Sequence, residues 1–454
     1  MSLQSINPAT GEVIETFEET APRELGRMLA SAQAAFHEWR ALPFATRAQS
    51  LQKAATLLRA RQADYARVMA LEMGKPIAQG AAEVDKCAWT CEFYAQHAEG
   101  FLAPQPRQTD ASASYVRFDP LGPVLAVMPW NFPFWQVFRF AAPALMAGNT
   151  AILKHASNVP RCALSIEEVL HDAGVPRGVF ATALVGSAAV GELIGDPRIM
   201  AVTLTGSDRA GSQVAERAGR ELKKAVLELG GSDPFIVLAD ADLAAAARTA
   251  ADARLVNSGQ SCIAAKRFIV VEAVAEQFLA RFVEELRSRK VGDPLAPDTQ
   301  VGPQARVDLR DALHHQVEES IKRGARRLLG GEVPAGRGAF YPPTLLTAVD
   351  KGMPAFDEET FGPVAAVIRA RDEADAVRLA NDSSFGLGAS LWTRDRARAE
   401  RLAAQIEAGA VFVNGLVKSD PRLPFGGIKR SGYGRELSEY GIREFVNIKS
   451  VWIA

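Results

Sequence analysis

The apolar positions of residues 23–97 recur at the three- and four-residue spacing of amphipathic helices, as in Leu29, Ala32 and Phe36. A Leu-Pro turn at residues 42–43 and a Gly-Lys-Pro turn at residues 74–76 interrupt this pattern. Pro and Gly are the residues that most often end a helix. The segment is therefore predicted to form two or three amphipathic helices.

A different pattern begins near Ser112. Residues 112–128 alternate between apolar and polar and then become apolar, which predicts a strand, a Pro/Gly turn and a buried strand. From Val124 to Leu229, helical stretches separate five short apolar runs, namely VLAVM, TAILK, VFATALV, AVTLT and AVLEL. Strands that alternate with helices in this way specify a parallel sheet.

A second series of the same kind follows. It contains FIVL, a helix to Asn257, FIVV, a long helix over 274–289, and later the runs FGPVAAVI, VRLAND, GASLWT and GAVFVN. We therefore expect an α/β protein with two doubly wound domains. The chain closes with the strand-like FVNIKSVWIA, which we expect to pair with another sheet of this chain or of a neighbouring subunit.

Charge and cysteine content narrow the functional classes. Lys and Arg total 52 and Asp and Glu total 53, a net charge of −1, so nucleic-acid binding through a basic face is not expected. The first residues show no secretory signal, and no apolar stretch is long enough to span a membrane. The 4 cysteines are typical of a reducing cytoplasm. Cys87 and Cys91 stand one helical turn apart with no further ligand at zinc spacing, so no metal site is expected.

Cys262 is the first candidate catalytic residue. It ends the run Asn-Ser-Gly-Gln-Ser-Cys and precedes apolar residues, which is typical of a loop at the boundary of an element. A free thiol has a reference pKa near 8.5, so only a few per cent is thiolate at neutral pH unless a cation or helix N-terminus lowers that value. A lone intracellular cysteine is more often structural, so a catalytic role depends on its neighbours.

Two further polar residues follow predicted strands. Glu228 ends the apolar run AVLEL before two glycines, where burial would make its carboxylate more basic than that of a solvated edge residue. Asn131 follows VLAVM in Pro-Trp-Asn-Phe-Pro, and Pro133 fits the first turn of the next helix. Alone, Asn131 would be a helix cap. Together with Cys262 and Glu228 it could bind an oxyanion in acyl transfer.

The sequence motifs for phosphate binding are less specific than those of the candidate catalytic residues. Neither the standard Rossmann glycine fingerprint nor a P-loop occurs. Gly206–Ser207 follows the run AVTLT, and Gly186 and Gly191 mark the preceding turn and helix. Glycine at a strand-to-helix turn exposes amides at the positive end of a helix, which suits a pyrophosphate, although an ordinary βα turn explains it nearly as well.

Eight motifs stand in a fixed order along the chain, namely Asn7-Pro8 with Thr10-Gly11-Glu12, Pro129–Pro133, Thr205–Ser207, Glu228–Gly231, Gly259–Cys262, Glu359–Pro363, Asn381 and Pro424–Gly427. In this order they resemble the aldehyde dehydrogenase superfamily over essentially the whole chain. Within it, the sequence is most similar to the bacterial NAD(P)-dependent succinate semialdehyde dehydrogenases of the shorter type, which share residues 130–137 and Lys154-His155-Ala156.

The resemblance implies a fold and an assembly. The aldehyde dehydrogenase fold has two doubly wound α/β domains and a small oligomerisation sheet. Carried over to this chain, the NAD(P)-binding domain covers residues 1–101 and 121–230, the catalytic domain covers 231–445, and 102–120 and 446–454 are oligomerisation segments. A homodimer or homotetramer is expected, without a nucleic-acid or membrane partner.

The resemblance also implies a mechanism. Addition of the Cys262 thiolate to an aldehyde gives an alkoxide that expels hydride far more readily than the aldehyde does. Asn131 and the Cys262 N–H would hold the oxyanion, and Glu228 would activate water to hydrolyse the thioester. The expected cofactor-binding residues are Met128, Trp130, Lys154, Ser157, Thr205, Gly206, Ser207, Leu229, Glu359 and Phe361.

Ser157 departs from the pattern of many NAD-specific relatives, which have Glu there. An acid binds the free 2′-hydroxyl and repels a 2′-phosphate. With Ser157, and with Lys154 and His155 beside it, NADP is also compatible with the site. The resemblance implies NAD first, because similar members of the family favour it, and NADP second.

The expected substrate is a short ω-semialdehyde, with succinate semialdehyde ahead of glutarate semialdehyde. Arg139 and Ser419 match positions that grip the substrate carboxylate in succinate semialdehyde dehydrogenases, and Phe425 is expected beside them. Such a role suggests degradation of γ-aminobutyrate or related amines. A second arginine of the longer-type enzymes is replaced by Val256. A salt bridge to a nearby acid is the alternative for Arg139.

Three alternative functions remain open. A broad aliphatic aldehyde dehydrogenase would have a structural Arg139. An acylating enzyme would pass the thioester to coenzyme A, although a hydrolytic Glu228 would compete with that transfer. A scaffold without activity would not need Cys262, Glu228 and Asn131 together.

Overall fold

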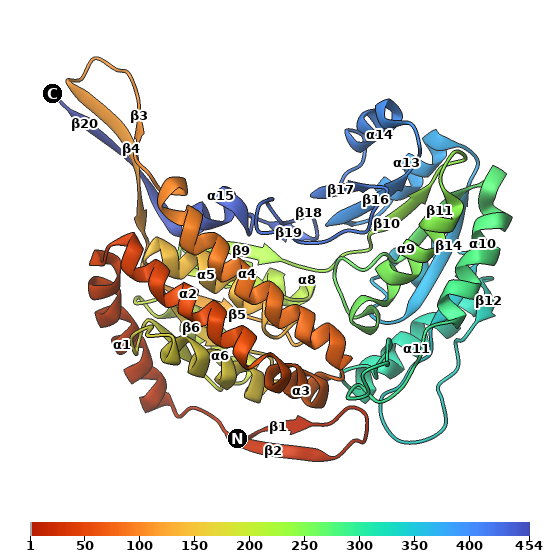
Figure 1. Cartoon of the computed structure of the whole chain (residues 1–454), viewed down its shortest axis with the longest axis horizontal. Helices are drawn as coiled ribbons and strands as arrows, with labels where there is room; N and C mark the ends of the chain where they lie inside the picture. Colours follow the sequence, from red (N-terminus) through yellow and green to blue (C-terminus); the bar gives the residue numbers. More distant parts are fainter. Residues whose placement is uncertain (1) are drawn as a thin grey trace.

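The computed structural model describes residues 2–454 and contains two α/β lobes and a projecting arm (Figure 1). The sheet of the first lobe has the strand order β19-β9-β8-β5-β6-β7 within the described residues. Strands β5 to β9 are parallel, and the short β19 adds antiparallel to the β9 edge. Their bounds are β5 Pro123–Val127, β6 Thr150–Lys154, β7 Phe180–Thr182, β8 Ala201–Thr205, β9 Lys224–Glu228 and β19 Gly432–Tyr433.

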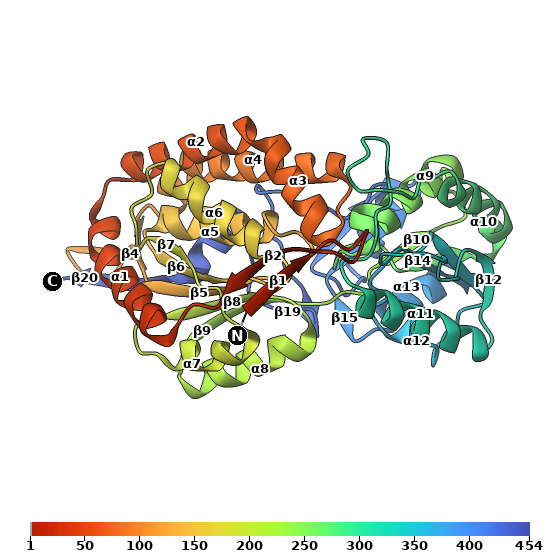
Figure 2. The same cartoon turned by 90° about the horizontal axis from the view of Figure 1, so that it is seen from below.

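Both faces of this first sheet are covered by helices (Figure 2). Successive residues of β6 point to opposite faces, so Ala151 and Leu153 pack in one core and Ile152 in another. The first core contains α2 Phe44–Ala60, α3 Gln62–Met73, α4 Ile77–Phe101, α5 Trp135–Ala147 and α6 Pro160–Asp172. The second contains α1 Pro22–Ala41, α7 Val190–Gly195 and α8 Asp208–Arg220.

The sheet of the second lobe has the order β12-β13-β14-β11-β10-β16-β17 and is parallel except for β12. Its strands are β10 Pro234–Val237, β11 Arg267–Val271, β12 Arg326–Leu329, β13 Thr344–Thr347, β14 Val364–Ala370, β16 Gly388–Trp392 and β17 Ala410–Val413. One face packs on α9 Leu243–Leu255 and α10 Glu272–Arg287. The other packs on α11 Val307–Lys322, α12 Pro354–Asp357, α13 Glu373–Asn381 and α14 Arg396–Ala403.

The arm is a three-stranded sheet with the order β20-β4-β3, and it extends away from both lobes (Figure 1). Strand β20, Val446–Ile453, pairs antiparallel with β4, Ala113–Pro120, along its whole length, and β3 covers Gln105–Pro106. The closing strand therefore pairs within its own chain. Smaller elements are the hairpin of β1 Ser2–Ile6 and β2 Val13–Glu18, the pair β15 Phe385–Gly386 and β18 Ile428–Lys429, and α15 Ser438–Ile442.

Two sequence predictions differ from the structure. Residues 22–101 form four helices, because the Arg61 break between α2 and α3 carries neither Pro nor Gly and was not recognisable. The run VRLAND, grouped with the strand-like segments, is the second half of α13, whose capping by the Asp372 side chain favours a helix. The residue-level domain boundaries stay a prediction.

Among residues 2–454, no helix combines the length and apolar character needed to cross a bilayer. In the same residues, no group of three or more His, Cys, Asp or Glu side chains is placed to hold a metal ion. Cys87 and Cys91 are buried in α4.

Candidate active site

The loop that carries Cys262 is held in an unusual backbone conformation. It follows the 3₁₀ turn Val256–Gly259, in which Asn257, Ser258 and Gly259 have φ of 52°, 56° and 79° in succession. A Cβ on Gly259 would lie 2.2 Å from the carbonyl carbon of Gly362, so only glycine fits there. The left-handed run turns the chain sharply after α9 and presents Cys262 before β11. This agrees with the predicted loop at an element boundary.

Asn131 lies against this loop, in the turn between β5 and α5. Its Oδ1 accepts from Gln136 Nε2 at 3.1 Å, and its Nδ2 donates to the Gln260 carbonyl at 3.1 Å. Asn257 Nδ2 in turn donates to the Asn131 carbonyl at 2.6 Å. These bonds fix the orientation of the amide, with its N–H side toward the cysteine loop. The second N–H of Nδ2 is the one that could donate to an oxyanion.

Helix α5 is capped by a residue that the sequence reasoning missed. Glu83, on α4, accepts from the N–H groups of Phe134 and Trp135, both at 2.9 Å, and forms a buried ion pair with Lys75. The helix therefore begins at Trp135, two residues later than the position of Pro133 predicted. A carboxylate at the positive end of a helix is favourable, and here it comes from a distant segment. Nothing local in the sequence indicates this pairing.

Glu228 ends β9 and is buried, as expected. Neither of its carboxylate oxygens has a hydrogen-bond partner within the described residues. Burial raises the pKa of Glu228 to about 8, while the positive charges of Arg139 and Arg435 oppose that rise. A carboxyl group with such a pKa is a stronger base than a solvated one and suits proton abstraction from water near neutral pH.

Arg139 forms a salt bridge to a nearby acid, which was the alternative to a substrate-binding role predicted for it. Its Nε pairs with the buried carboxylate of Glu436, its Nη2 donates to Thr205 Oγ1 at 3.0 Å, and its guanidinium lies 4.8 Å from the centre of the Phe425 ring. Burial raises the pKa of the Cys262 thiol to about 12, and the charge of Arg139, followed by that of Lys266, opposes this effect. Arg139 therefore favours the charged forms of both Cys262 and Glu228.

A cavity of about 710 Å³ opens beside the thiol. Cys262, Arg139, Ser419 and Phe425 all line it, so the structure brings the predicted substrate residues together with the candidate nucleophile. Its volume is typical of small-molecule sites. Further lining residues that the sequence reasoning did not single out are Lys86, Phe132, Trp135 and Gln136.

The predicted dinucleotide residues of the first lobe lie at the carboxyl ends of its parallel strands or just after them. Ser207 caps α8, where its Oγ accepts from the Ala210 N–H at 3.3 Å, after Thr205 and Gly206 at the end of β8. A Cβ on Gly211 would lie 2.6 Å from the side chain of Leu229, so glycine permits close packing of α8 on the residue that follows β9. The exposed amides at this helix N-terminus fit a pyrophosphate.

The end of β6 carries the residues expected along the adenosine ribose. Met128 N–H donates to the Lys154 carbonyl at 3.0 Å, and Ser157 is exposed. Lys154 is buried, which lowers its pKa, and no acid lies within 4.0 Å of it in residues 2–454. A buried cation without a counterion fits a ribose hydroxyl or phosphate.

His155 does not add the positive charge that its position next to Lys154 suggested. Its ring contacts the Pro133 carbonyl through Nε2 at 2.9 Å and accepts from the Ala156 N–H through Nδ1 at 2.8 Å. Burial lowers the pKa of His155 to about 4, so the ring is neutral at pH 7. The electrostatic argument for NADP therefore rests on Lys154.

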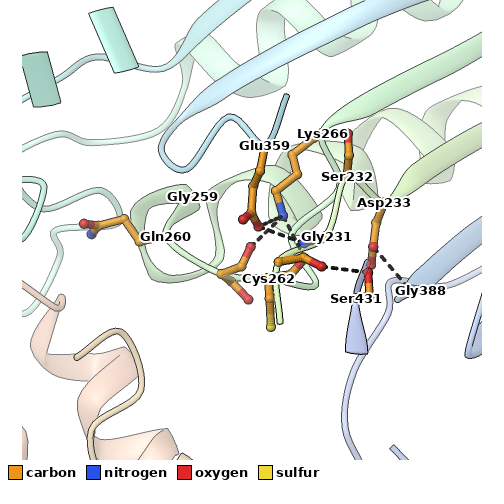
Figure 3. Close-up of polar contacts among 12 residues, drawn as sticks. Gly231, Ser232, Asp233, Gly259, Gln260, Cys262, Lys266, Glu359, Gly388 and Ser431 are labelled. Atoms are coloured by element: carbon orange, nitrogen blue, oxygen red, sulfur yellow. Dashed lines mark hydrogen bonds and ion pairs between the residues drawn. The ribbon is translucent and has the colours of Figure 1, made fainter. Parts of the chain in front are cut away.

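Glu359 lies near Cys262 and is held by two contacts (Figure 3). Its carboxylate accepts from the Gly231 N–H at 3.0 Å and pairs with Lys266 Nζ at 3.3 Å. Lys266 also donates to the Cys262 carbonyl at 2.7 Å. Phe361 and Trp130 meet edge to face, with ring centroids 5.8 Å apart. This group fits the expected ribose and nicotinamide end of a dinucleotide.

The site and fold agree with one family. The aldehyde dehydrogenase family model matches residues 1–451, and the chain belongs to this family. It is thus an oxidoreductase that acts on aldehydes, and the resemblance and the fold class predicted from the sequence are confirmed.

Full-length relatives narrow the class further. A protein of Synechocystis sp. named "Probable succinate-semialdehyde dehydrogenase" (NADP+) is 54% identical over 454 residues and covers all of both chains. The Mycobacterium tuberculosis protein named succinate-semialdehyde dehydrogenase (NADP+) 1 is 51% identical over 457 residues, again with full coverage. The crystal structure of succinic semialdehyde dehydrogenase from Streptococcus pyogenes in complex with NADP+ superposes with a TM-score of 0.97, at 38% identity and 99% coverage of each chain.

Proposed function

We propose that the protein oxidises succinate semialdehyde to succinate with a nicotinamide dinucleotide, in a pathway that degrades γ-aminobutyrate or related amines. The observation that carries this proposal is a single cavity with Cys262 in its wall together with Ser419 and the cationic groups of the site. A short aldehyde with a distal carboxylate matches that chemistry. The names of the full-length relatives support the same substrate.

The first chemical step belongs to Cys262. Its thiolate adds to the aldehyde carbon, and the carbonyl oxygen becomes an alkoxide. The second N–H of Asn131 Nδ2 and the backbone N–H of Cys262 donate to this oxygen. Arg139 supplies a fixed positive charge that favours the thiolate. When bound, the dinucleotide supplies a nicotinamide ring that accepts the hydride expelled from the tetrahedral carbon, which leaves a thioester on Cys262.

The second step belongs to Glu228. Its carboxylate removes a proton from water, the resulting hydroxide adds to the thioester carbon, and the carbon–sulfur bond breaks to release the carboxylic acid. The thiol is regenerated by that proton. Within residues 2–454 the Glu228 carboxylate oxygens have no hydrogen-bond partner, so they are free to accept the proton from water.

A comparison of aldehydes tests the substrate. We expect kcat/KM for succinate semialdehyde to exceed that for butanal roughly 100-fold, since one charge-assisted hydrogen-bonded contact contributes about 1.5–3 kcal/mol. Glutarate semialdehyde is expected to fall between them. Initial rates of NAD(P)H formation at 340 nm measure all three. Equal values for butanal would establish the broad aliphatic alternative, and turnover that depends on added coenzyme A would establish the acylating one.

NADP is proposed as the preferred dinucleotide, which places it ahead of NAD in contrast to the order expected from the sequence. Ser157 is exposed and lies three residues after the buried Lys154, and the Synechocystis and Mycobacterium tuberculosis relatives carry NADP+ in their names. A 2′-phosphate would then meet a hydroxyl and an ammonium group, with no acid at residue 157 to repel it.

Ser157→Glu is expected to reverse this preference. The new carboxylate would repel the 2′-phosphate and accept from the 2′-hydroxyl of NAD, so KM for NADP should rise roughly 10- to 100-fold while KM for NAD falls. Steady-state kinetics with each dinucleotide at saturating aldehyde measure the change. Ser157→Ala is the matched control and should keep the NADP preference. A wild-type enzyme that strongly prefers NAD would contradict the proposed order.

A homodimer or homotetramer assembled through the arm is also part of the proposal. Strand β20 exposes Ile448, Trp452 and Ile453, and exposed apolar groups on an edge strand favour pairing with another chain. A cytoplasmic location is proposed from the cysteines, since all four are free thiols.

A further inference from the structure

Lys266, directly before β11, is a fully buried cation that contacts the backbone of the cysteine loop. Its Nζ donates to the Ser261 carbonyl at 2.8 Å and to the Cys262 carbonyl at 2.7 Å, and it lies 3.3 Å from the Glu359 carboxylate. Burial lowers the pKa of Lys266, and the negative charge of Glu359 opposes that effect. The three acceptors match the three N–H groups of an ammonium ion, so the buried charge is fully paired.

The peptide between Ser261 and Cys262 is the unit on which Lys266 acts. Its carbonyl oxygen accepts from Lys266, and its N–H is one of the two donors expected to hold the oxyanion. Because a trans peptide is planar, its C=O and N–H point in opposite directions. A bond that fixes the carbonyl therefore also fixes the direction of the N–H. Within residues 2–454 the Cys262 N–H has no acceptor, so it is available to a substrate oxygen.

The charge of Lys266 also strengthens that donor. A cation that donates to a carbonyl draws electron density toward the oxygen and leaves the N–H of the same peptide more positive. Hydrogen bonds linked in this way reinforce each other where the local dielectric is low, and Ser261 is fully buried. Figure 3 shows Lys266 approaching the loop from the side opposite to the Cys262 sulfur. Its effect on a substrate oxygen is therefore transmitted through the backbone.

We propose that Lys266 is a positioning residue for the first chemical step, in which it orients and polarises the Ser261–Cys262 peptide so that the Cys262 N–H binds the oxyanion. Its second bond holds the carbonyl on the other side of the cysteine, and Glu359 holds the ammonium group in place. The other expected donor, Asn131, is oriented by separate bonds. The inference rests on the proposed function, because the oxyanion forms only when the thiolate adds to an aldehyde.

Lys266→Met tests the proposal, because methionine keeps the approximate length of the side chain and removes its charge and its donors. Complete removal of an oxyanion donor costs roughly 10²- to 10³-fold, so a weakened donor should slow the first turnover roughly 30-fold. Rapid mixing of succinate semialdehyde with enzyme saturated with dinucleotide measures this rate constant as formation of NAD(P)H. Fluorescence titration with NADPH establishes that the variant is folded and sets the saturating concentration.

Alkylation of Cys262 by iodoacetamide separates this role from an effect on the thiol alone. The reaction consumes the thiolate and displaces iodide, but it forms no oxyanion. Loss of the Lys266 charge raises the pKa of the thiol and therefore slows alkylation and acylation by the same factor. Acylation should lose roughly tenfold more than alkylation at the same pH, since only acylation uses the oxyanion donors. Peptide mass mapping measures the alkylation at Cys262.

Two variants serve as comparisons. Lys266→Arg keeps the charge and the donors and should restore the first turnover to within roughly fivefold of the wild type. Lys223→Met is the matched control, because Lys223 Nζ also donates to two carbonyls, those of Ile194 and Asp196, both at 2.6 Å, and it does not line the cavity. It should change neither rate by more than about twofold. If Lys266→Met does not fold, Lys266→Gln should slow the first turnover roughly tenfold and alkylation less.

The outcomes separate the inference from the proposed function. A wild-type enzyme that forms no NAD(P)H from any aldehyde would overturn both. An active wild-type enzyme, combined with a Lys266→Met variant that keeps the rate of the first turnover, would overturn the inference alone. Equal losses in acylation and alkylation would also overturn it, because Lys266 would then act only on the ionisation or placement of the sulfur.

Discussion

Replacement of Cys262 by serine is expected to lower kcat by roughly 10³-fold or more, because a hydroxyl is a far weaker nucleophile than a thiolate at neutral pH. The surroundings of Cys262 make this loss severe. The charges of Arg139 and Lys266 help a half-buried thiol to ionise, but they cannot ionise an alcohol at the same position. Formation of NADPH from succinate semialdehyde under saturating conditions measures the change.

Binding of the cofactor provides the control for the Cys262→Ser variant. The replacement leaves the cavity and the dinucleotide residues intact, so NADPH binding by fluorescence titration should match that of the wild type. Cys162→Ser, at a buried cysteine of α6 that does not line the cavity, controls for the chemistry of replacing sulfur. Undiminished steady turnover by the Cys262→Ser enzyme would overturn the covalent mechanism.

Replacement of Glu228 by glutamine is expected to lower steady-state turnover roughly 10²- to 10⁴-fold, the range usual for a general base. Acylation should survive, because Glu228 acts only after hydride has left. Rapid mixing with aldehyde and NADP should therefore give a burst of NADPH close to one per site, followed by a slow phase. Peptide mass mapping should find the acyl group on Cys262. A variant that loses the burst would place Glu228 in the first step.

The rate of thioester hydrolysis is expected to increase with pH. Glu228 accepts a proton only as a carboxylate, and its pKa is raised to about 8. The rate constant for thioester hydrolysis, measured in single turnovers, should therefore rise with pH up to about 8 and level off above that value. The Glu228→Gln enzyme should lack this rise. A wild-type profile that falls over the same range would contradict the assignment.

The sequence predicted the parallel sheets well because apolar runs separated by helical spacing leave few alternatives. The five runs between Val124 and Leu229 became β5 to β9, with Glu228 at a strand end as expected. The roles of Cys262, Glu228 and Asn131 stay predictions. The placement of Glu228 and Asn131 follows from that topology, since ligands collect at the carboxyl ends of parallel strands. Cys262 instead precedes β11 and is positioned by the left-handed turn after α9.

The contacts that refine the site could not be predicted, because each joins segments far apart in the chain. Glu83 caps a helix 52 residues later. Arg139 meets Glu436, and Lys86 meets Ser419, 333 residues away. Neither periodicity nor local motifs report such pairs. The neutral state of His155 was missed for a related reason, because the sequence does not reveal how completely burial removes its water.

The pairing of β19 with β9 has a consequence for biosynthesis. The N-terminal part of a chain emerges from the ribosome first. The parallel strands of the first sheet can therefore assemble before Gly432–Tyr433 are available to cover the β9 edge. Glu436, the counterion of Arg139, emerges with the same late segment. Nascent chains therefore hold the reactive sulfur without its finished electrostatic environment, and catalytic competence arrives only after residues 432–436 have been translated.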